Sequence, residues 1–161
     1  MTILKLDGTK LGLPQHKGRV EAWLAGERIA PITVDMALTQ KCQMSCVFCY
    51  ANLQQNPAEP VAWEVYENFL DDCTIIGHAP GEGVKAISLV SDGESTLNKY
   101  FYRFIQACHD RGIDIASGTN GEALKKEQMP MLIDNLTYLR INFNAATPAA
   151  NAKIMGTTEK A

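Results

Sequence analysis

The sequence has little of several features that would point to particular classes of protein. No apolar stretch is long enough to span a bilayer, and Met1–Gly12 contains no apolar run of signal-peptide length. The sequence also has no large excess of charge of either sign. It contains 15 Lys and Arg residues and 18 Asp and Glu residues, for a formal net charge of -3. This balance does not exclude RNA or DNA as a substrate, but it indicates no basic surface of the kind that binds nucleic acid. We therefore expect a cytoplasmic protein with no membrane segment.

Disulfide pairing does not explain the cysteines of this chain. Five cysteines cannot all pair, and no secretory signal precedes them. Three lie within eight residues, at Cys42, Cys46 and Cys49, in the spacing Cys-x3-Cys-x2-Cys. Three thiolates can each bind one iron of a cubane 4Fe-4S cluster, whereas ordinary electron-transfer clusters use four cysteines. One iron is then left without a protein ligand, and an open coordination position is typical of a catalytic metal site.

Zinc is the alternative metal for the same three thiols. His16, His78 or His109 could supply a fourth ligand, since Cys3His is a common structural zinc set. None of these histidines is near the cysteine loop in sequence, and a hydrophobic content of 46% is high for a small zinc module. The other two cysteines, Cys73 and Cys108, fall on the apolar stripes of expected helices. We expect them in the core and favour iron over zinc for the loop.

Strand-like and helix-like patterns alternate along the chain. Its 161 residues and apolar content are enough for one globular domain with a proper core. Period-two and helical spacings predict, in order, a strand at 32–39, a helix at 61–76, a strand at 84–90, a helix at 98–111, a strand at 113–117, a helix at 122–135 that Pro130 must break or restart, and a strand at 138–144. This order predicts right-handed crossovers and an α/β fold with a parallel sheet.

We divide the chain into an N-terminal extension, residues 1–31, and a core domain, residues 32–161. The extension holds one brief helix, on which Val20, Trp23 and Leu24 are spaced to pack against the core. In the core, the first and fourth strands each carry polar residues on one parity, although strands of a parallel sheet normally have apolar residues on both faces. A polar cavity on one side of the sheet would explain this pattern, and an incomplete sheet with a wetter face is the alternative.

The cysteine loop lies at the carboxyl end of the first expected strand, with Phe48 just before the last cysteine and Tyr50 just after it. It resembles the signature of the radical S-adenosylmethionine (radical SAM) superfamily, and the resemblance covers Pro31 to about Gly156. In that family the open iron is chelated by the amino and carboxylate groups of S-adenosylmethionine. The resemblance implies that Phe48 and Tyr50 flank the adenine. It also implies a partial TIM-type barrel, here truncated to about four βα units, fewer than relatives build.

The loop after the second expected strand is similar to the family's Gly-Gly-Glu element, which holds the amino group of the methionine moiety. Gly93 and Glu94 match it, whereas Asp92 replaces the first glycine and Ser95 the proline that often follows. A carboxylate can accept hydrogen bonds from an ammonium, and glycine allows a close approach of the backbone. The same four residues also form an ordinary turn sequence.

Two later loops carry further resemblances. Thr119 and Asn120 begin a Thr-Asn-Gly sequence that many members carry after the third strand, close to the nucleoside. Asn142 stands where relatives place a polar residue on the ribose hydroxyls, and Asn144 shares its parity. Each of these elements follows an expected strand, where parallel sheets and barrels place their active sites.

The resemblance implies an enzyme that uses a reduced 4Fe-4S cluster to cleave S-adenosylmethionine to methionine and a 5'-deoxyadenosyl radical. That radical would abstract hydrogen from a substrate, with a flavodoxin or ferredoxin as the electron donor. No catalytic residue is identified beyond the cluster ligands. The stretch Arg19–Leu24 ahead of Pro31 resembles radical SAM proteins of uncharacterised or peptide-modifying type, so a peptide is the first hypothesis for the unidentified substrate.

Three alternatives stay open at this point. The chain could be an inactive or partner-dependent fragment of such an enzyme, with a partner chain that completes the barrel. It could be a scaffold that keeps a cluster without cleaving the cofactor, or a zinc-stabilised binding module. No second group of cysteines is available for an auxiliary cluster.

Overall fold

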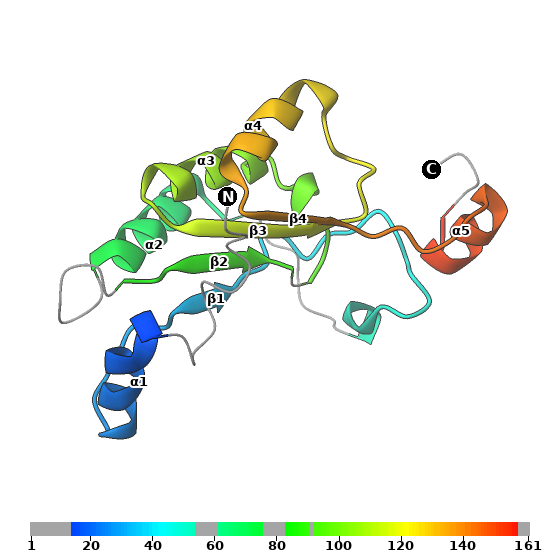
Figure 1. The fold of residues 1–161 in the computed structure, drawn as a ribbon. Coiled ribbons are helices and arrows are strands. Elements are labelled where there is room, and N and C mark those ends of the chain that lie inside the picture. Colours follow the sequence, from blue (N-terminus) through cyan, green and yellow to red (C-terminus); the bar gives the residue numbers. More distant parts are fainter. Residues whose placement is uncertain (1–13, 54–60, 76–82, 91, 158–161) are drawn as a thin grey trace.

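A parallel four-stranded sheet forms the centre of the fold. The structure is a computed structural model and describes residues 14–53, 61–75, 83–90 and 92–157. The strand order is β1-β2-β3-β4, and each neighbouring pair is parallel (Figure 1). The strands are β1 (Thr33–Asp35), β2 (Ala86–Leu89), β3 (Asp114–Thr119) and β4 (Tyr138–Ile141). The predicted α/β class and the predicted parallel sheet are confirmed.

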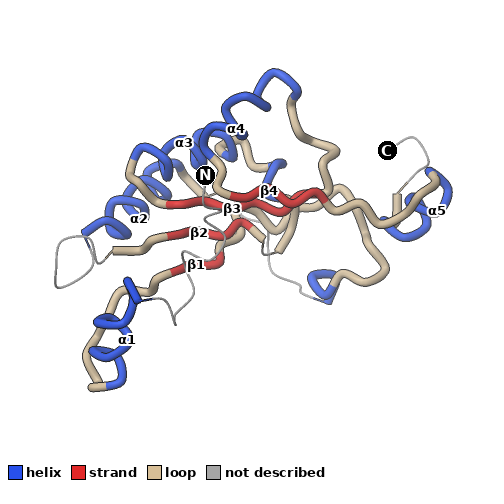
Figure 2. Tube along the Cα trace, viewed as in Figure 1, coloured by secondary structure: helices blue, strands red, loops and turns tan. Residues whose placement is uncertain are grey.

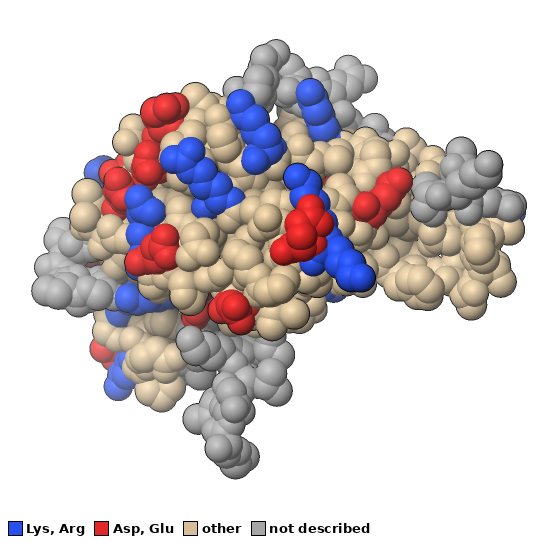
Figure 3. All heavy atoms as spheres, turned by 90° about the horizontal axis from the view of Figure 1, so that it is seen from above, with Lys and Arg blue, Asp and Glu red and all other residues tan. Residues whose placement is uncertain are grey.

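Five α-helices accompany the described part of the sheet. They are α1 (Lys17–Leu24), α2 (Trp63–Ile75), α3 (Phe101–Asp110), α4 (Met129–Asn135) and α5 (Pro148–Met155), with short 3-10 turns at Pro14–His16, Tyr50–Leu53, Ser95–Leu97 and Lys126–Gln128. Among the described residues, no helix combines the length and apolar character needed to cross a membrane. Acidic and basic side chains are interspersed on the face that Figure 3 shows, in agreement with the small net charge.

The hydrophobic core lies between one face of the sheet and helices α2, α3 and α4 (Figure 1). The predicted stripe of α3 is buried completely, because Phe101, Phe104, Ile105 and Cys108 recur on one side of the helix and have no exposed surface. Each fully buried large apolar side chain contributes roughly 1.5–3 kcal/mol. Cys73 of α2 is buried in the same core, so both cysteines outside the loop lie where the sequence predicts.

Polar side chains collect on the opposite face of the sheet. Asp35 on β1 is in register with Ser88 on β2, which pairs in turn with Ala116 on β3 and Tyr138 on β4. Asp35 and Tyr138 are exposed. The polar parity of the first and fourth strands therefore lies on the face away from α2, α3 and α4.

A buried arginine holds α1 against the start of the sheet. The Arg19 guanidinium donates hydrogen bonds to the carbonyls of Ala30 and Pro31, both at 3.4 Å, and of Gly83 at 3.2 Å. Arg19 is only 8% exposed. A buried cation has to be hydrogen-bonded, and three carbonyls satisfy that requirement here. Residues 30–31 and 83 precede β1 and β2, so α1 lies at the amino-terminal edge of the sheet.

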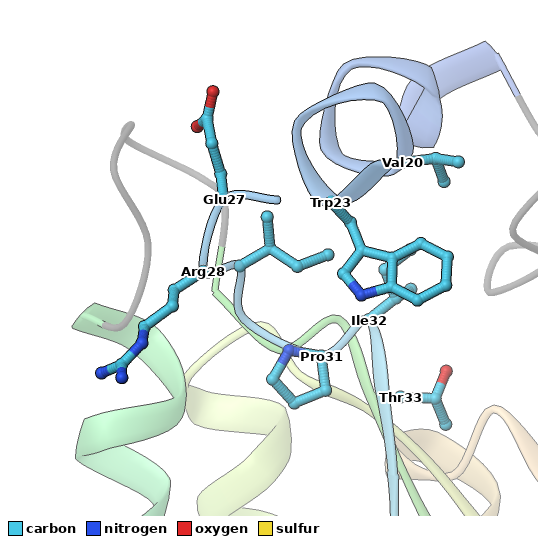
Figure 4. Close-up of a pocket in the computed structure, with 8 residues that line it drawn as sticks. Val20, Trp23, Glu27, Arg28, Pro31, Ile32 and Thr33 are labelled. Carbon is cyan, nitrogen blue, oxygen red and sulfur yellow. The ribbon is translucent and has the colours of Figure 1, made fainter. Parts of the chain in front are cut away.

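The predicted apolar stripe of this helix is wrong. Trp23 and Leu24 are 61% and 72% exposed, and neither reaches the core cluster. Val20 and Trp23 instead line an open pocket beside Pro31 and Ile32 (Figure 4). The spacing of apolar residues predicts the wrong buried side of α1, because the hydrogen bonds of Arg19 determine which side of the helix faces the domain.

Helix α4 is shorter than predicted, since it begins at Met129 rather than near Glu122. Pro130 occupies its first turn, where a missing backbone N–H costs nothing. Strand β4 also ends early, at Ile141 rather than Asn144. The early end of β4 affects the site, because it leaves Asn142 in a loop that lines the cavity.

Candidate cofactor site

The loops that follow the four strands meet at the carboxyl-terminal edge of the sheet (Figure 2). This is a consequence of the topology, because all strands of a parallel sheet point the same way. The loops enclose a cavity of about 140 Å³. Every residue that the sequence nominates for the cluster or the cofactor lines this cavity, with the exception of Asn144. Six further residues line it and were not predicted: Ala51, Val90, Asp92, Gly118, Arg140 and Met155.

The three loop cysteines form no disulfide and share this cavity. Cys42 is exposed, and Cys46 and Cys49 are partly buried. Burial raises the pKa of the Cys42 and Cys46 thiols above the ordinary value. Nearby negative charge raises the pKa further, from Glu94 and Cys49 for Cys42 and from the other two loop cysteines for Cys46. A bound iron would reverse this effect, since a metal cation stabilises the thiolate form.

The donor set fits an iron-sulfur cluster. Three sulfur atoms on one loop are soft ligands of the kind that iron-sulfur clusters use. They surround a shared cavity, and within the described residues no three His, Cys, Asp or Glu side chains converge to hold a single metal ion. Two of the histidines considered for zinc lie at the other edge of the sheet, His16 ahead of α1 and His109 at the end of α3. His78 falls outside the described residues.

Glu94 ties the loop after β2 to the loop after β3. Glu94 is 3% exposed, and its carboxylate accepts four hydrogen bonds from three residues, one after β2 and two at the end of β3. The donors are the Thr96 N–H at 3.2 Å, the Thr96 hydroxyl at 2.6 Å, the Thr119 hydroxyl at 2.7 Å and the Asn120 N–H at 2.8 Å. Oε1 accepts three of these bonds, whereas Oε2 accepts only that of Asn120. Since each carboxylate oxygen has about two lone-pair sites, Oε2 keeps one acceptor position.

Gly93 allows the same loop to approach the loop after β1. Its φ of +71° lies in the left-handed region, and a side chain there would meet the backbone carbonyl of Thr39. The neighbouring Glu94 N–H donates to the Lys41 carbonyl at 2.8 Å. The close approach thus places the Glu94 loop directly against the segment that leads into Cys42.

Asn120 connects the cysteine loop with the loop after β3. Its Oδ1 accepts hydrogen bonds from Gln43 Nε2 at 3.2 Å and from the Glu122 N–H at 3.0 Å. Its side chain also hydrogen-bonds the Cys42 thiol, which lowers the pKa of that thiol against the effect of burial. Thr119, 2% exposed, accepts from the Gly121 N–H at 3.0 Å. These bonds fix the position of Asn120 beside the first cysteine.

The structure separates the two asparagines that follow β4. Asn142 lines the cavity, and its N–H donates to the Thr119 carbonyl at 2.8 Å. Asn144 lies elsewhere, with Nδ2 3.0 Å from the Met155 sulfur. Shared parity requires continuous extended backbone, and β4 ends at Ile141. The alternation that placed both side chains on one face therefore stops before Asn144.

Three of the unpredicted lining residues carry polar or soft groups. The Asp92 carboxylate accepts a hydrogen bond from the Tyr50 hydroxyl and thereby raises the pKa of that phenol. Arg140 lies beside Gly118, where a Cβ would come within 3.4 Å of its guanidinium. Arg140 shares the parity of Asn142, so the strand pattern could have identified it. Met155, on α5, gives no such signal in the sequence.

Comparison with known proteins identifies the family. A family model described as the Radical SAM superfamily matches residues 36–161. The chain belongs to the radical SAM superfamily. Members use a 4Fe-4S cluster and S-adenosylmethionine, which is the cofactor pair that the sequence predicts. A comparison with functionally curated proteins found no match.

Several solved radical SAM structures share the fold. SuiB of Streptococcus suis, bound to S-adenosylmethionine, is 21% identical with a TM-score of 0.65, and the match covers 91% of this chain and 33% of SuiB. BtrN in complex with AdoMet and 2-DOIA is 14% identical with a TM-score of 0.59, covering 74% of this chain and 48% of BtrN. The chain thus spans about a third of SuiB and half of BtrN. At these identities the likeness shows the fold, a partial radical SAM barrel with four parallel strands.

Proposed function

We propose that this chain holds a 4Fe-4S cluster on Cys42, Cys46 and Cys49 and binds S-adenosylmethionine in the adjoining cavity, as part of a radical SAM enzyme. The observation that carries the proposal is that the three thiols share one cavity with polar residues from the loops after β2, β3 and β4. When bound, these cofactors supply one-electron cleavage of S-adenosylmethionine and a carbon radical that takes hydrogen from the substrate. The protein's part is to bind, orient and exclude competing reactions.

Two charged side chains suit the methionine end of the cofactor. Oε2 of Glu94 has an acceptor position left for the ammonium group, next to the small Gly93. Arg140 is the cationic side chain among the described residues that line the cavity, and its guanidinium can bind a carboxylate through two parallel hydrogen bonds. A carboxylate and a guanidinium in one cavity would orient an amino acid group.

The nucleoside end of the cofactor suits other residues that line the cavity. The Asn142 side chain can hydrogen-bond ribose hydroxyls, and Thr119 and Asn120 lie beside it. Phe48 and Tyr50 are each 61% exposed, so both rings are free to stack against adenine. Asn144 would have to leave the Met155 sulfur to reach the cofactor, and it is the weakest member of this proposed set.

A peptide is the proposed substrate class. SuiB is also known in a structure bound to its precursor peptide SuiA, with a TM-score of 0.65 to this chain. The polar face of the sheet, which includes Asp35 and Ser88, adjoins the cavity and offers hydrogen-bonding groups to a polar substrate. A flavodoxin or ferredoxin is the proposed electron donor. Free thiols and an oxygen-labile cluster suit a reducing compartment such as the cytosol.

The free edge of β4 suits a further part of the barrel. In the described structure β4 pairs with β3 alone, and Ile141 and Phe143 are 51% and 83% exposed. An exposed strand edge with apolar side chains is a template for another strand. We propose that additional chain, or a partner chain, completes the barrel here and contributes to the substrate site.

Anaerobic reconstitution tests the cofactor proposal. We expect about four irons per chain, with matching sulfide, and an electron paramagnetic resonance spectrum of the reduced protein that changes when S-adenosylmethionine is added. Zinc in place of iron would support the binding-module alternative. A spectrum that does not change when S-adenosylmethionine is added would indicate a scaffold that does not cleave the cofactor. Zinc binding or an unchanged spectrum would each overturn the proposal.

A matched pair of cysteine variants controls this experiment. Cys46→Ala removes a proposed ligand, whereas Cys73→Ala removes a thiol buried in the core, away from the loop. We expect the first variant to lose the cluster and the second to retain it. Equal iron content in the two variants would show that the iron is bound without the loop.

A further inference from the structure

The carboxyl end of α5 is docked on the cysteine loop. The Ser45 N–H donates to the Met155 carbonyl and the Val47 N–H donates to the Ile154 carbonyl, both at 3.0 Å. The last carbonyls of a helix have no partner within the helix, so these bonds satisfy two groups that would otherwise need water. The two donor amides lie on either side of Cys46. Hydrogen bonds to α5 therefore fix the backbone around the central cysteine.

The sequence of α5 sets both of its ends. Thr147 caps the start by accepting a hydrogen bond from the Ala150 N–H at 3.3 Å, and Pro148 follows in the first turn. Gly156 ends the helix with a φ of +63°, and its N–H returns to the Ala152 carbonyl. This is a standard left-handed helix end, in which glycine avoids the steric cost of a side chain. The stop falls at the position that meets the loop.

Gly156 is needed there for a second reason. A Cβ at this position would collide with the Ser45 carbonyl, in addition to adopting an unfavourable φ. Gly112, which ends α3, has nearly the same φ of +67°, but a Cβ there would meet no atom within 4 Å. The two glycines thus share the backbone conformation and differ in contact with the cysteine loop.

Met155 provides the side-chain part of the contact. It is 3% exposed, lines the cavity, and places its sulfur 3.7 Å from the Cys46 sulfur. The Asn144 amide holds this thioether at 3.0 Å. A thiolate on iron has no proton to donate, so in the loaded site the Met155 sulfur would act by packing against Cys46 and excluding water. Methionine suits this place because its polarisable side chain fills irregular spaces.

We infer that Met155 and Gly156 are positioning residues for the cluster: the end of α5 holds Cys46 and its neighbouring amides in the shape that binds iron. This inference rests on the proposed function, because it takes the loop to be a cluster site. Three consecutive residues of the loop, Ser45, Cys46 and Val47, each form a hydrogen bond with the end of α5. Supports of this kind around metal ligands commonly alter metal affinity by about 10–100-fold.

The test compares Gly156→Ala with its matched control Gly112→Ala. Both variants carry the same backbone penalty, but only the first displaces Ser45. After anaerobic reconstitution, we expect Gly156→Ala to lose iron to a chelator about tenfold faster than wild type. Gly112→Ala should match wild type. Equal rates in the two variants would overturn the inference.

A second pair of variants covers the case in which Gly156→Ala does not fold. Met155→Ala opens space beside Cys46, whereas Met131→Ala truncates a half-buried methionine on α4. We expect faster iron loss and an altered line shape of the reduced cluster only for Met155→Ala. Met155→Leu, which keeps the volume, should restore iron retention and separate packing from any effect of the sulfur.

Labelling of the metal-free protein distinguishes this inference from the proposed function. If α5 covers Cys46, Met155→Ala should raise the iodoacetamide labelling rate of Cys46 several-fold over Met131→Ala, with or without a cluster site. A wild-type chain that takes up no iron would defeat the proposed function. Equal Cys46 labelling rates in the two variants would defeat the inference about α5, whatever the iron content.

Discussion

The Glu94 carboxylate accepts the hydroxyl hydrogen of Thr119 at 2.7 Å, across 25 residues of sequence. Both side chains are buried, and Oε1 also accepts from the backbone and hydroxyl of Thr96. This bond joins the loop that follows β2 to the last residue of β3. The glutamate therefore shapes the cavity whether or not a cofactor is present.

Glu94→Gln should destabilise the metal-free protein. The amide group keeps the size of the side chain, but one of the two acceptor atoms becomes a donor that faces other donors. Leaving a buried hydrogen-bonding group unsatisfied costs about 1–3 kcal/mol, and more for charged groups. Urea unfolding followed by circular dichroism would measure the loss. Glu127→Gln, at an exposed position, is the control, and equal midpoints for the two variants would contradict the prediction.

Arg140→Gln should weaken S-adenosylmethionine binding without loss of the cluster. The guanidinium lines the cavity beside Gly118, and no cysteine ligand depends on it. Loss of a charge-assisted hydrogen bond to a carboxylate predicts an affinity about tenfold lower, the scale of 1.4 kcal/mol. Calorimetric titration of the reconstituted protein would measure it. Arg28→Gln, at the amino-terminal edge, should bind normally, and normal binding by Arg140→Gln would remove it from the proposed site.

Arg19→Met should release α1 from the sheet. Methionine has a similar length but leaves the carbonyls of Ala30, Pro31 and Gly83 without the three hydrogen bonds of the guanidinium. We expect faster chymotrypsin cleavage after Trp23, which mass spectrometry of the fragments would detect. Arg28→Met removes an exposed arginine from the same segment and should leave the cleavage rate unchanged. Equal cleavage rates in the two variants would mean that contacts around the open pocket beside Pro31 and Ile32, rather than the hydrogen bonds of Arg19, hold α1 in place.

Thiol labelling should divide the five cysteines into two groups. Cys73 and Cys108 are 2% and 0% exposed, and burial raises the pKa of both thiols, so they stay protonated and inaccessible. In the metal-free native protein, iodoacetamide should modify the three loop cysteines only. Reconstitution with iron should protect those three, and denaturant should expose all five. Rapid labelling of Cys108 in the native protein would contradict the buried core.

Much of the core domain could be predicted from local patterns. The i, i+3, i+4 and i+7 spacing of Phe101 to Cys108 needs no tertiary information to identify the buried side of α3. The parallel sheet follows from the alternation of strands and helices, because a helix that crosses over the sheet joins strands that run in the same direction. The cysteine spacing likewise indicates its chemistry by itself.

The errors arose where tertiary contacts outweigh periodicity. The orientation of α1 is set by Arg19, a residue type that sequence patterns assign to the surface. The spacing of Asn142 and Asn144 places both on one face only while the backbone stays extended, and β4 ends at Ile141. Met155 could not be found from sequence, since its role depends on the docking of a short helix against a loop more than 100 residues earlier.

The contact between Cys46 and Met155 joins residues 109 apart, and this separation has a consequence for biosynthesis. The cysteine loop is translated before β2, whereas the residues that accept the Ser45 and Val47 hydrogen bonds are translated last among the described helices and strands. A nascent chain that stops after β4 has all three thiols but not the loop shape that α5 maintains. On the proposed function, cluster insertion should therefore follow translation of α5, and a chain that stops before this helix should retain iron poorly.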